Sequence, residues 1–188
     1  MVSFDHTQEP HVLVVLSPGF EEIEAVTVID ILRRAKIDVV TASLEDNPSV
    51  KGSHGIIVEA DTTLSQINRA DFGTIVLPGG MRGVENMLQS ERLKAVIDEM
   101  NRNDAVLAAV CAAPLVYDTM GLLEGRRFTC HPCIWDRVSH VAEDVPTLTD
   151  GRLVTGRSAG CAMPWSLALV EKLLGELPDG LLKGLRLP

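Results

Sequence analysis

Residues 105–117 of the chain read AVLAAVCAAPLVY, an apolar run that stops at one cysteine and continues as a helical pattern. The run is typical of a strand buried on both faces, and Pro114 suits a first helical turn, where its missing N–H would be unpaired anyway. We therefore expect Cys111 at a strand-to-helix corner, where helix N–H groups and the positive end of the helix dipole point at the sulfur. The alternative is a small core residue, because a free cysteine packs like a hydrophobic side chain.

The rest of the chain alternates strand-like and helix-like patterns, which predicts an α/β fold with a mostly parallel sheet covered by helices on both faces. The expected strands are 11–16, 37–42, 56–60, 72–77, 105–110 and 127–130, with a hairpin of 146–149 and 152–155 around Asp150-Gly151. The expected helices are 20–35, 84–101, one from about 114, 132–140 and 162–174, and residues 43–55 are expected to form a surface connection.

Length and composition limit the class of protein. The chain has 188 residues, of which 46% are hydrophobic and 23% are charged. This composition predicts a polar leader over residues 1–10 and a single domain over residues 11–188. The net charge of −9 argues against a nucleic-acid partner. No apolar run is long enough for a membrane span and the first residues lack a signal-peptide pattern, so we expect a soluble cytoplasmic protein with reduced cysteines.

Chemistry in open α/β sheets gathers at the carboxyl ends of the strands. Pro78-Gly79-Gly80 ends one strand and could cradle a phosphate, hold an oxyanion or form a plain turn, although it lacks the full dinucleotide and P-loop patterns. Glu21, Glu22 and Glu24 open the first helix, where carboxylates are usually solvated. Glu24 is the one expected to turn inward, because it lies one helical turn before an apolar residue.

Cys130-His131-Pro132-Cys133 follows a later predicted strand and permits two sharper interpretations. One is half of a zinc site, and the other is a Cys-x-x-Cys redox pair. Zinc needs a second pair of ligands, and the remaining cysteines, Cys111 and Cys161, show no recognisable spacing. We therefore expect no metal and no cofactor.

Four motifs together resemble the ThiJ/PfpI superfamily, and within it the subfamily of the parkinsonism-associated protein deglycase. They are Gly19-Phe20-Glu21-Glu22-Ile23-Glu24, Leu77-Pro78-Gly79-Gly80, Ala109-Val110-Cys111-Ala112-Ala113-Pro114 and Thr129-Cys130-His131-Pro132. The similarity extends from about His11 to Leu174 and implies a flavodoxin-like three-layer sandwich, usually homodimeric, with a reactive cysteine.

The resemblance also assigns roles to residues. Cys111 matches the nucleophile, Glu24 the carboxyl group that hydrogen-bonds it, and His131 the nearby histidine. The backbone N–H groups of Gly80 and Ala112, with Gly79 beside them, match the anion pocket.

The sequence departs from the family pattern in several places. His54 stands where many relatives carry an arginine near the site across the dimer, and an imidazole attracts anions only when it is protonated. Gly52 and Glu59 replace secondary cysteines of some relatives, so redox responses of those cysteines should be absent. Ala113 replaces a frequent glycine, which would narrow the pocket slightly.

The activity that the resemblance implies is glyoxalase or deglycase chemistry on methylglyoxal, glyoxal, or their early adducts with amines and thiols. A thiol with a pKa of ~8.5 is a few per cent ionised at neutral pH, and a helix N-terminus contributes only roughly 0.5–2 kcal/mol. A protonated Glu24 could supply the missing stabilisation, so that the pair shares one proton. The alternatives are an oxidative-stress sensor or redox-regulated chaperone that uses oxidation of Cys111, and, more distantly, a cysteine peptidase. The peptidase reading lacks the usual histidine directly after the cysteine, where Ala112 stands.

Overall fold

The computed structural model describes residues 11–186, and the expected leader over residues 1–10 lies outside this part of the chain. Its centre is a seven-stranded sheet with the order β5-β2-β1-β6-β7-β9-β8. All neighbouring strands are parallel except the hairpin of β8 and β9. The strands are β1 (His11–Leu16), β2 (Val39–Ser43), β5 (Thr62–Thr63), β6 (Phe72–Leu77), β7 (Val106–Val110), β8 (Thr147–Asp150) and β9 (Leu153–Gly156). A separate antiparallel ribbon pairs β3 (Ser49–Lys51) with β4 (Ile57–Glu59).

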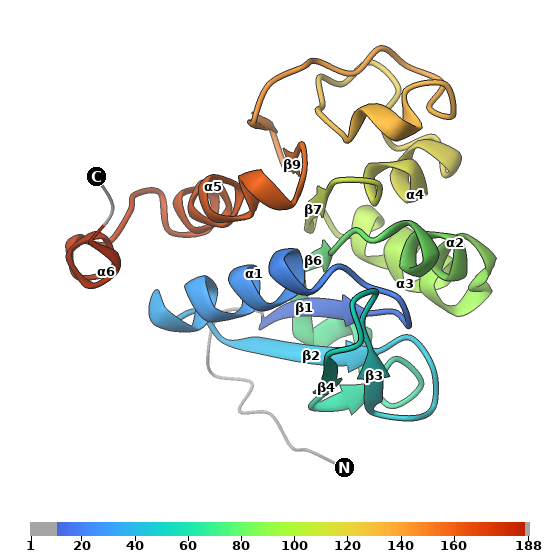
Figure 1. Ribbon diagram of the computed structural model, residues 1–188, viewed down its shortest axis with the longest axis horizontal. Helices are drawn as coiled ribbons and strands as arrows, with labels where there is room; N and C mark the ends of the chain where they lie inside the picture. Colours follow the sequence, from blue (N-terminus) through green and yellow to red (C-terminus); the bar gives the residue numbers. More distant parts are fainter. Residues whose placement is uncertain (1–10, 187–188) are drawn as a thin grey trace.

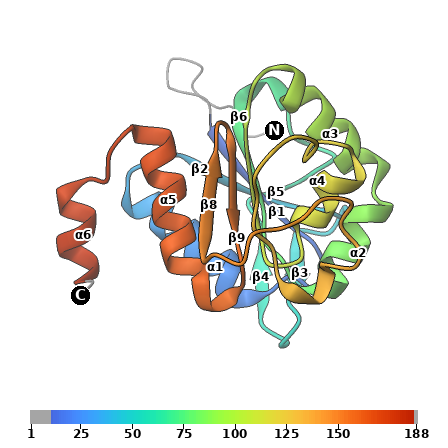
Figure 2. The same ribbon diagram turned by 90° about the horizontal axis from the view of Figure 1, so that it is seen from above.

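Helices cover both faces of the sheet, as Figures 1 and 2 show. One face carries α1 and α5, which pack on each other, and the other carries α2, α3 and α4. The helices are α1 (Glu22–Arg34), α2 (Met81–Gln89), α3 (Glu91–Arg102), α4 (Pro114–Thr119), α5 (Ala162–Leu174) and α6 (Asp179–Leu185). Short 3₁₀ turns occupy Arg69–Asp71, Pro132–Ile134 and Ala159–Cys161. The expected flavodoxin-like sandwich is confirmed. No helix within residues 11–186 is long and apolar enough to cross a membrane.

Alternating side chains of the central strands fill two cores. In β1, Leu13 and Val15 pack on the side of α2, α3 and α4, whereas Val14 and Leu16 pack against α1 and α5. This alternation explains why the strands read as uninterrupted apolar runs, since both faces of a covered parallel sheet are buried.

The sheet has a topological switch point between β1 and β6. From β1 the chain passes to β2 on one side and returns to β6 on the other. Connections that diverge in this way leave a crevice at the carboxyl ends of the strands, which is where ligands bind in open α/β sheets. Glu24 follows β1, Gly79 follows β6 and Cys111 follows β7.

Two predicted segments on the N-terminal side differ from the structure. The expected surface connection over residues 43–55 contains β3, which pairs with β4. The single helix expected over residues 84–101 is two helices, because Ser90 takes an extended conformation and its hydroxyl accepts the N–H of Leu93 as an N-cap.

Three predictions near the C-terminal side are also corrected. Residues 127–130 form no strand, because both edges of β9 are already paired and the N–H of Thr129 bonds to the side chain of Thr155. The helix expected over residues 132–140 is only the 3₁₀ turn Pro132–Ile134. In the hairpin, Asp150 pairs with Leu153, so the two-residue turn is shifted by one position from the expected Asp150-Gly151.

Candidate active site

Cys111 lies at the corner between β7 and α4, with Pro114 in the first turn of the helix as expected. The residue is half-buried and has a φ of 62°, a left-handed conformation that is uncommon outside glycine. Its N–H donates to the carbonyl of Gly156 at 2.9 Å, and its own carbonyl accepts the N–H of His131 at 2.8 Å. These two bonds hold the strained corner in place.

Glu24 lies in the first turn of α1 and is completely buried. Its Oε2 accepts the N–H of Gly79 at 2.8 Å, and its carboxyl group interacts with the thiol of Cys111. No donor in the described part of the chain bonds to Oε1. That oxygen is free to carry the proton that a neutral carboxyl group would donate to the sulfur.

Two glycines allow the end of β6 to approach this pair. A Cβ on Gly79 would lie 2.6 Å from Oε2 of Glu24 and 2.7 Å from Cβ of Cys111. Gly80 has a φ of 90°, and a Cβ there would lie 2.6 Å from the backbone nitrogen of Glu21. The N–H groups of Gly80 and Ala112 both point at the sulfur and stabilise its anionic form.

Glu24 and Cys111 each change the pKa of the other, because their side chains lie in contact. Burial, followed by the charge of Glu21, raises the pKa of Glu24 from 4.5 to about 7, although bonds from Gly79 and Cys111 lower it. Burial also raises the pKa of Cys111 beside an ionised Glu24, while the N–H groups of Gly80 and Ala112 lower it. Two adjacent buried anions repel, so the two groups do not ionise independently and titrate as a coupled pair.

His131 is brought to the site through its backbone bond to Cys111. Its Nδ1 accepts the N–H of Cys133 at 3.1 Å. A neutral imidazole with Nδ1 as acceptor carries its proton on Nε2, which is then the donor available to a substrate.

Cys130 and Cys133 have different environments, and both are free thiols. Cys130 is completely buried in the core, and burial raises its pKa to about 12. Cys133 is exposed on the 3₁₀ turn. Unlike the half-buried Cys111, Cys130 has no exposed surface through which a reaction partner could reach its sulfur, which argues against a reactive Cys-x-x-Cys pair.

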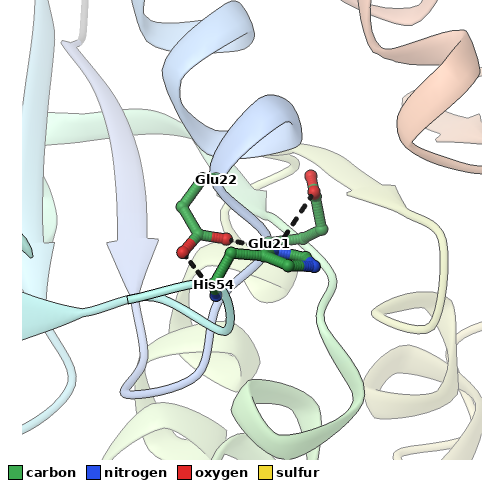
Figure 3. A group of neighbouring side chains, drawn as sticks. All are labelled: Glu21, Glu22 and His54. Carbon is green, nitrogen blue, oxygen red and sulfur yellow. Dashed lines mark hydrogen bonds and ion pairs between the residues drawn. The ribbon is translucent and has the colours of Figure 1, made fainter. Parts of the chain in front are cut away.

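His54 is found on the ribbon turn, where it contacts its own chain (Figure 3). Its Nδ1 lies 2.9 Å from Oε2 of Glu22 and 4.0 Å from Oε1 of Glu21. Glu22, usually expected in solvent at this helix position, is buried and also accepts the N–H of His54 at 2.6 Å. The hydrogen-bond partners of Glu22 lie 31 to 34 positions later in the chain, so no local pattern indicates that it is buried.

These contacts change two pKa values. Burial alone would raise the pKa of Glu22, but hydrogen bonds from the side chain and backbone of His54 lower it to about 2. The same bond to Glu22, followed by its charge, raises the pKa of His54. His54 is therefore protonated to a higher pH than a free imidazole.

Glu21, Glu22 and His54 are the one group within residues 11–186 that offers three metal-ligand atoms, all within 4.8 Å of one another. The oxygens of Glu22 already accept hydrogen bonds from His54, Ser53 and Ile56. The positive end of the α1 dipole also disfavours a cation at this position. The arrangement serves to fasten the ribbon to α1.

The family model described as the DJ-1/PfpI family matches residues 10–172. The chain belongs to the DJ-1/PfpI family. Protein dj-1beta of Drosophila melanogaster is 34% identical over 167 residues, which cover 87% of this chain and 89% of that relative. A deglycase of Thermococcus kodakarensis is 27% identical, with 86% of this chain and 98% of the relative covered.

Solved DJ-1 structures share the fold over almost the whole chain. A cysteine-to-alanine mutant of a DJ-1 superfamily protein from Salmonella typhimurium has a TM-score of 0.90 at 34% identity, covering 96% of this chain and 100% of that one. Oxidized DJ-1 of Toxoplasma gondii has a TM-score of 0.89 at 34% identity, with coverage of 95% and 98%.

Some DJ-1 relatives are much longer than this chain. Protein DJ-1 homolog B of Arabidopsis thaliana is 40% identical over 168 residues, covering 88% of this chain but 38% of the relative. Homolog A is matched over 44% of its length. The chain therefore spans less than half of these two plant proteins.

Proposed function

We propose that this DJ-1/PfpI protein is a glutathione-independent glyoxalase or deglycase in which Cys111 is the nucleophile. Its substrates are methylglyoxal, glyoxal, or their early adducts with amines and thiols. The observation that carries the proposal is the buried carboxyl group of Glu24 against Cys111, with the N–H groups of Gly80 and Ala112 at the sulfur. A family relative named as a deglycase supports the same chemistry.

The reaction needs one nucleophile and one group that carries a proton. The Cys111 thiolate adds to the aldehyde carbon of methylglyoxal, and the resulting oxyanion takes the proton of Glu24 to give a hemithioacetal. The Glu24 carboxylate then removes the carbon-bound proton and returns it to the neighbouring carbon through an enediol, which leaves a thioester. Water hydrolyses the thioester to lactate and regenerates the thiol. The sum is methylglyoxal plus water giving lactate, and no external oxidant or reductant is required.

Burial suits Glu24 to this role. A carboxyl group with a pKa of about 7 exists in both forms near neutral pH, so it can donate a proton in one step and accept one in the next. His131, through Nε2–H, would polarise the second carbonyl oxygen of the substrate. No metal or cofactor takes part in this proposal.

A redox sensor is the second candidate, because one solved relative is described as oxidized. Two equivalents of a peroxide would oxidise the same thiolate first to a sulfenate and then to a sulfinate, and a protonated Glu24 would donate to one of the sulfinate oxygens. A cysteine peptidase is disfavoured, because the Nδ1 of His131 is occupied by the N–H of Cys133 and Ala112 follows the cysteine.

We also propose a homodimer formed through the face that joins α1 to the ribbon. Ile23 and Val26 on α1 are 58% and 48% exposed, and Ile56 and Ile57 on the ribbon are 56% and 62% exposed. Apolar side chains gathered on two adjoining elements are typical of an interface with a second copy. His54 lies on the turn of the same ribbon and would border the partner subunit. The free cysteines suit the reducing cytoplasm, where we place the protein.

The test of the proposed function is lactate formation from methylglyoxal without added glutathione. We expect lactate with the wild type, none with Cys111→Ala or Glu24→Ala, and a strong reduction with His131→Ala. The matched control is Cys130→Ser/Cys133→Ser, which removes the two other thiols next to His131 and should retain most of the activity. Lactate formation by Cys111→Ala at the wild-type rate would refute the proposal.

A further inference from the structure

Residues 131–140, here called the strap, lie near α4 (Figure 1). Hydrogen bonds join both ends of the strap to other parts of the chain. At the first end, the N–H of His131 donates to the carbonyl of Cys111 at 2.8 Å. At the other end, the N–H of Ser139 donates to Oδ2 of Asp118 at 2.8 Å, and Nδ1 of His140 lies 3.1 Å from Oδ1. Both oxygens of one carboxylate are thus bound to the strap.

Asp118 is one of three buried acidic residues within residues 11–186, the others being Glu22 and Glu24. The side chain of Asp118 is only 2% exposed, whereas that of His140 is 36% exposed. Asp118 belongs to α4, the short helix that begins three residues after Cys111. The short helix α4 therefore connects Cys111, which lies just before its first turn, to Asp118, which holds the end of the strap.

Between its anchors the strap is also held by packing, because Ile134 is completely buried in the core and Val138 packs against the same core. Cys133, Trp135 and Asp136 are exposed. Arg137 reaches α2 through an exposed ion pair of 3.6 Å with Glu85 and a contact of 3.8 Å with the sulfur of Met81. Exposed ion pairs are weak, typically below ~1 kcal/mol, whereas bonds to a buried carboxylate are among the stronger ones in proteins.

We propose that Asp118 is a positioning residue, which holds the strap on α4 and thereby sets the imidazole of His131 against Cys111. The inference rests on the proposed function of His131 as a proton donor to the substrate. In this role Asp118 acts through its bonds to Ser139 and His140, and not by contact with the Cys111 thiol or the substrate.

The activity test uses a double-mutant cycle in lactate formation. Asp118→Ala should lower kcat roughly 10- to 100-fold, because a misplacement of about 1 Å costs this much in a proton-transfer step. The same substitution added to His131→Ala should cause no further loss. Asp118→Asn should recover part of the rate, because its amide oxygen still accepts the N–H of Ser139.

The control for general destabilisation is Tyr117→Phe. Tyr117 neighbours Asp118 on the same helix and is completely buried, but its hydroxyl bonds to the carbonyls of Ile75 and Ala108 in the sheet. This variant should be destabilised without losing the part of the rate that depends on His131. An equal loss of kcat in Tyr117→Phe and Asp118→Ala would contradict the positioning role.

A second readout does not depend on turnover. The two tryptophans are Trp135 on the strap, which is 42% exposed, and Trp165, which is completely buried, so acrylamide quenching reports on Trp135. Asp118→Ala should increase quenching and accelerate amide exchange at His131, and Tyr117→Phe should change neither. Unchanged quenching and exchange in Asp118→Ala would overturn the inference, whether or not the wild type makes lactate. If Asp118→Ala increases quenching and exchange but the wild type makes no lactate, the role of Asp118 in holding the strap is supported and the proposed function is refuted.

Discussion

At the scale of single residues, the candidate site places two ionisable groups, Glu24 and Cys111, side by side. Burial raises the pKa of both Glu24 and Cys111, and each anion opposes the other. Because two adjacent buried anions repel, at least one of the two groups keeps its proton. In the proposed chemistry that proton resides on Glu24 while the sulfur of Cys111 attacks.

Glu24→Gln should change how stability depends on pH. The pKa of Glu24 rises from 4.5 in the unfolded chain to about 7 in the folded one, so the folded state binds more protons between these values. Its contribution is present below about pH 4.5 and is lost as pH rises through 7, which amounts to about 3 kcal/mol. Urea unfolding in a Cys111→Ser background should show this decline with Glu24 and a flatter profile with Gln. Parallel profiles would contradict the raised pKa.

Gly79→Ala should abolish activity, because the new Cβ would lie 2.6 Å from the Glu24 carboxylate and 2.7 Å from Cβ of Cys111. Overpacking of this kind also costs roughly 1–3 kcal/mol of stability. The matched control is Gly184→Ala on α6, where no atom lies within 4 Å of the new Cβ. Lactate assays and thermal melts of both variants measure the difference, and wild-type activity in Gly79→Ala would show that the close approach is not required.

At the scale of elements, the ribbon of β3 and β4 depends on one buried carboxylate. Glu22→Ala should loosen the turn, because the N–H groups of His54 and Ile56 lose their acceptor. Hydrogen exchange at these two amides should accelerate at least about tenfold, the factor that corresponds to ~1.4 kcal/mol, while exchange at Val14 in β1 should stay unchanged.

The same carboxylate predicts a response to acid. The folded pKa of Glu22 is about 2, below its ordinary value of 4.5. Its contribution to stability is therefore present above about pH 4.5 and is lost as pH falls through 2. In the wild type, the protection of the ribbon amides, measured relative to the intrinsic exchange rate at each pH, should stay high down to about pH 4.5 and fall below it. Loss of protection already at neutral pH would contradict the pairing of Glu22 with His54.

The elements that could be predicted from the sequence are those that local pattern alone determines. The bounds of β1, β6 and α5 were predicted correctly, because each is an apolar run or periodic helix flanked by clear breaks. The strand expected over residues 127–130 was wrong because pairing depends on a free sheet edge, which no local pattern reveals. Helical spacing also predicted that Glu24 faces inward. The burial of Glu22 and the two anchors of the strap depend on partners far away in sequence, so they could not be predicted.

At the scale of the whole molecule, the two helical layers and the sheet place the carboxyl ends of β1, β6 and β7 at one edge. The apolar face of α1 and the ribbon lies next to this edge, since both elements join through Glu22. A second copy on this face would adjoin the candidate active site. The proposed dimer interface and the candidate active site would therefore be neighbours.

Ile57→Glu should convert the proposed dimer to a monomer, because it places a charge on the exposed apolar face. Light scattering at micromolar concentration should give twice the chain mass of 20.4 kDa for the wild type and the single mass for the variant. The control is Val141→Glu, which is 93% exposed but lies outside this face. A monomeric wild type would refute the proposed dimer.

The most direct test of the central claim is the labelling of the four cysteines with iodoacetamide at about pH 6, followed by peptide mapping. If Cys111 and Glu24 share one proton, a fraction of Cys111 is thiolate at this pH, and its labelling should be much faster than that of the exposed Cys133 and the buried Cys130 and Cys161. Glu24→Ala should slow the labelling of Cys111, and Glu24→Gln should slow it less, because an amide still donates a hydrogen bond. If Cys111 instead reacts no faster than Cys133 and gains reactivity only in the alkaline range, burial prevails and the nucleophile assignment is wrong.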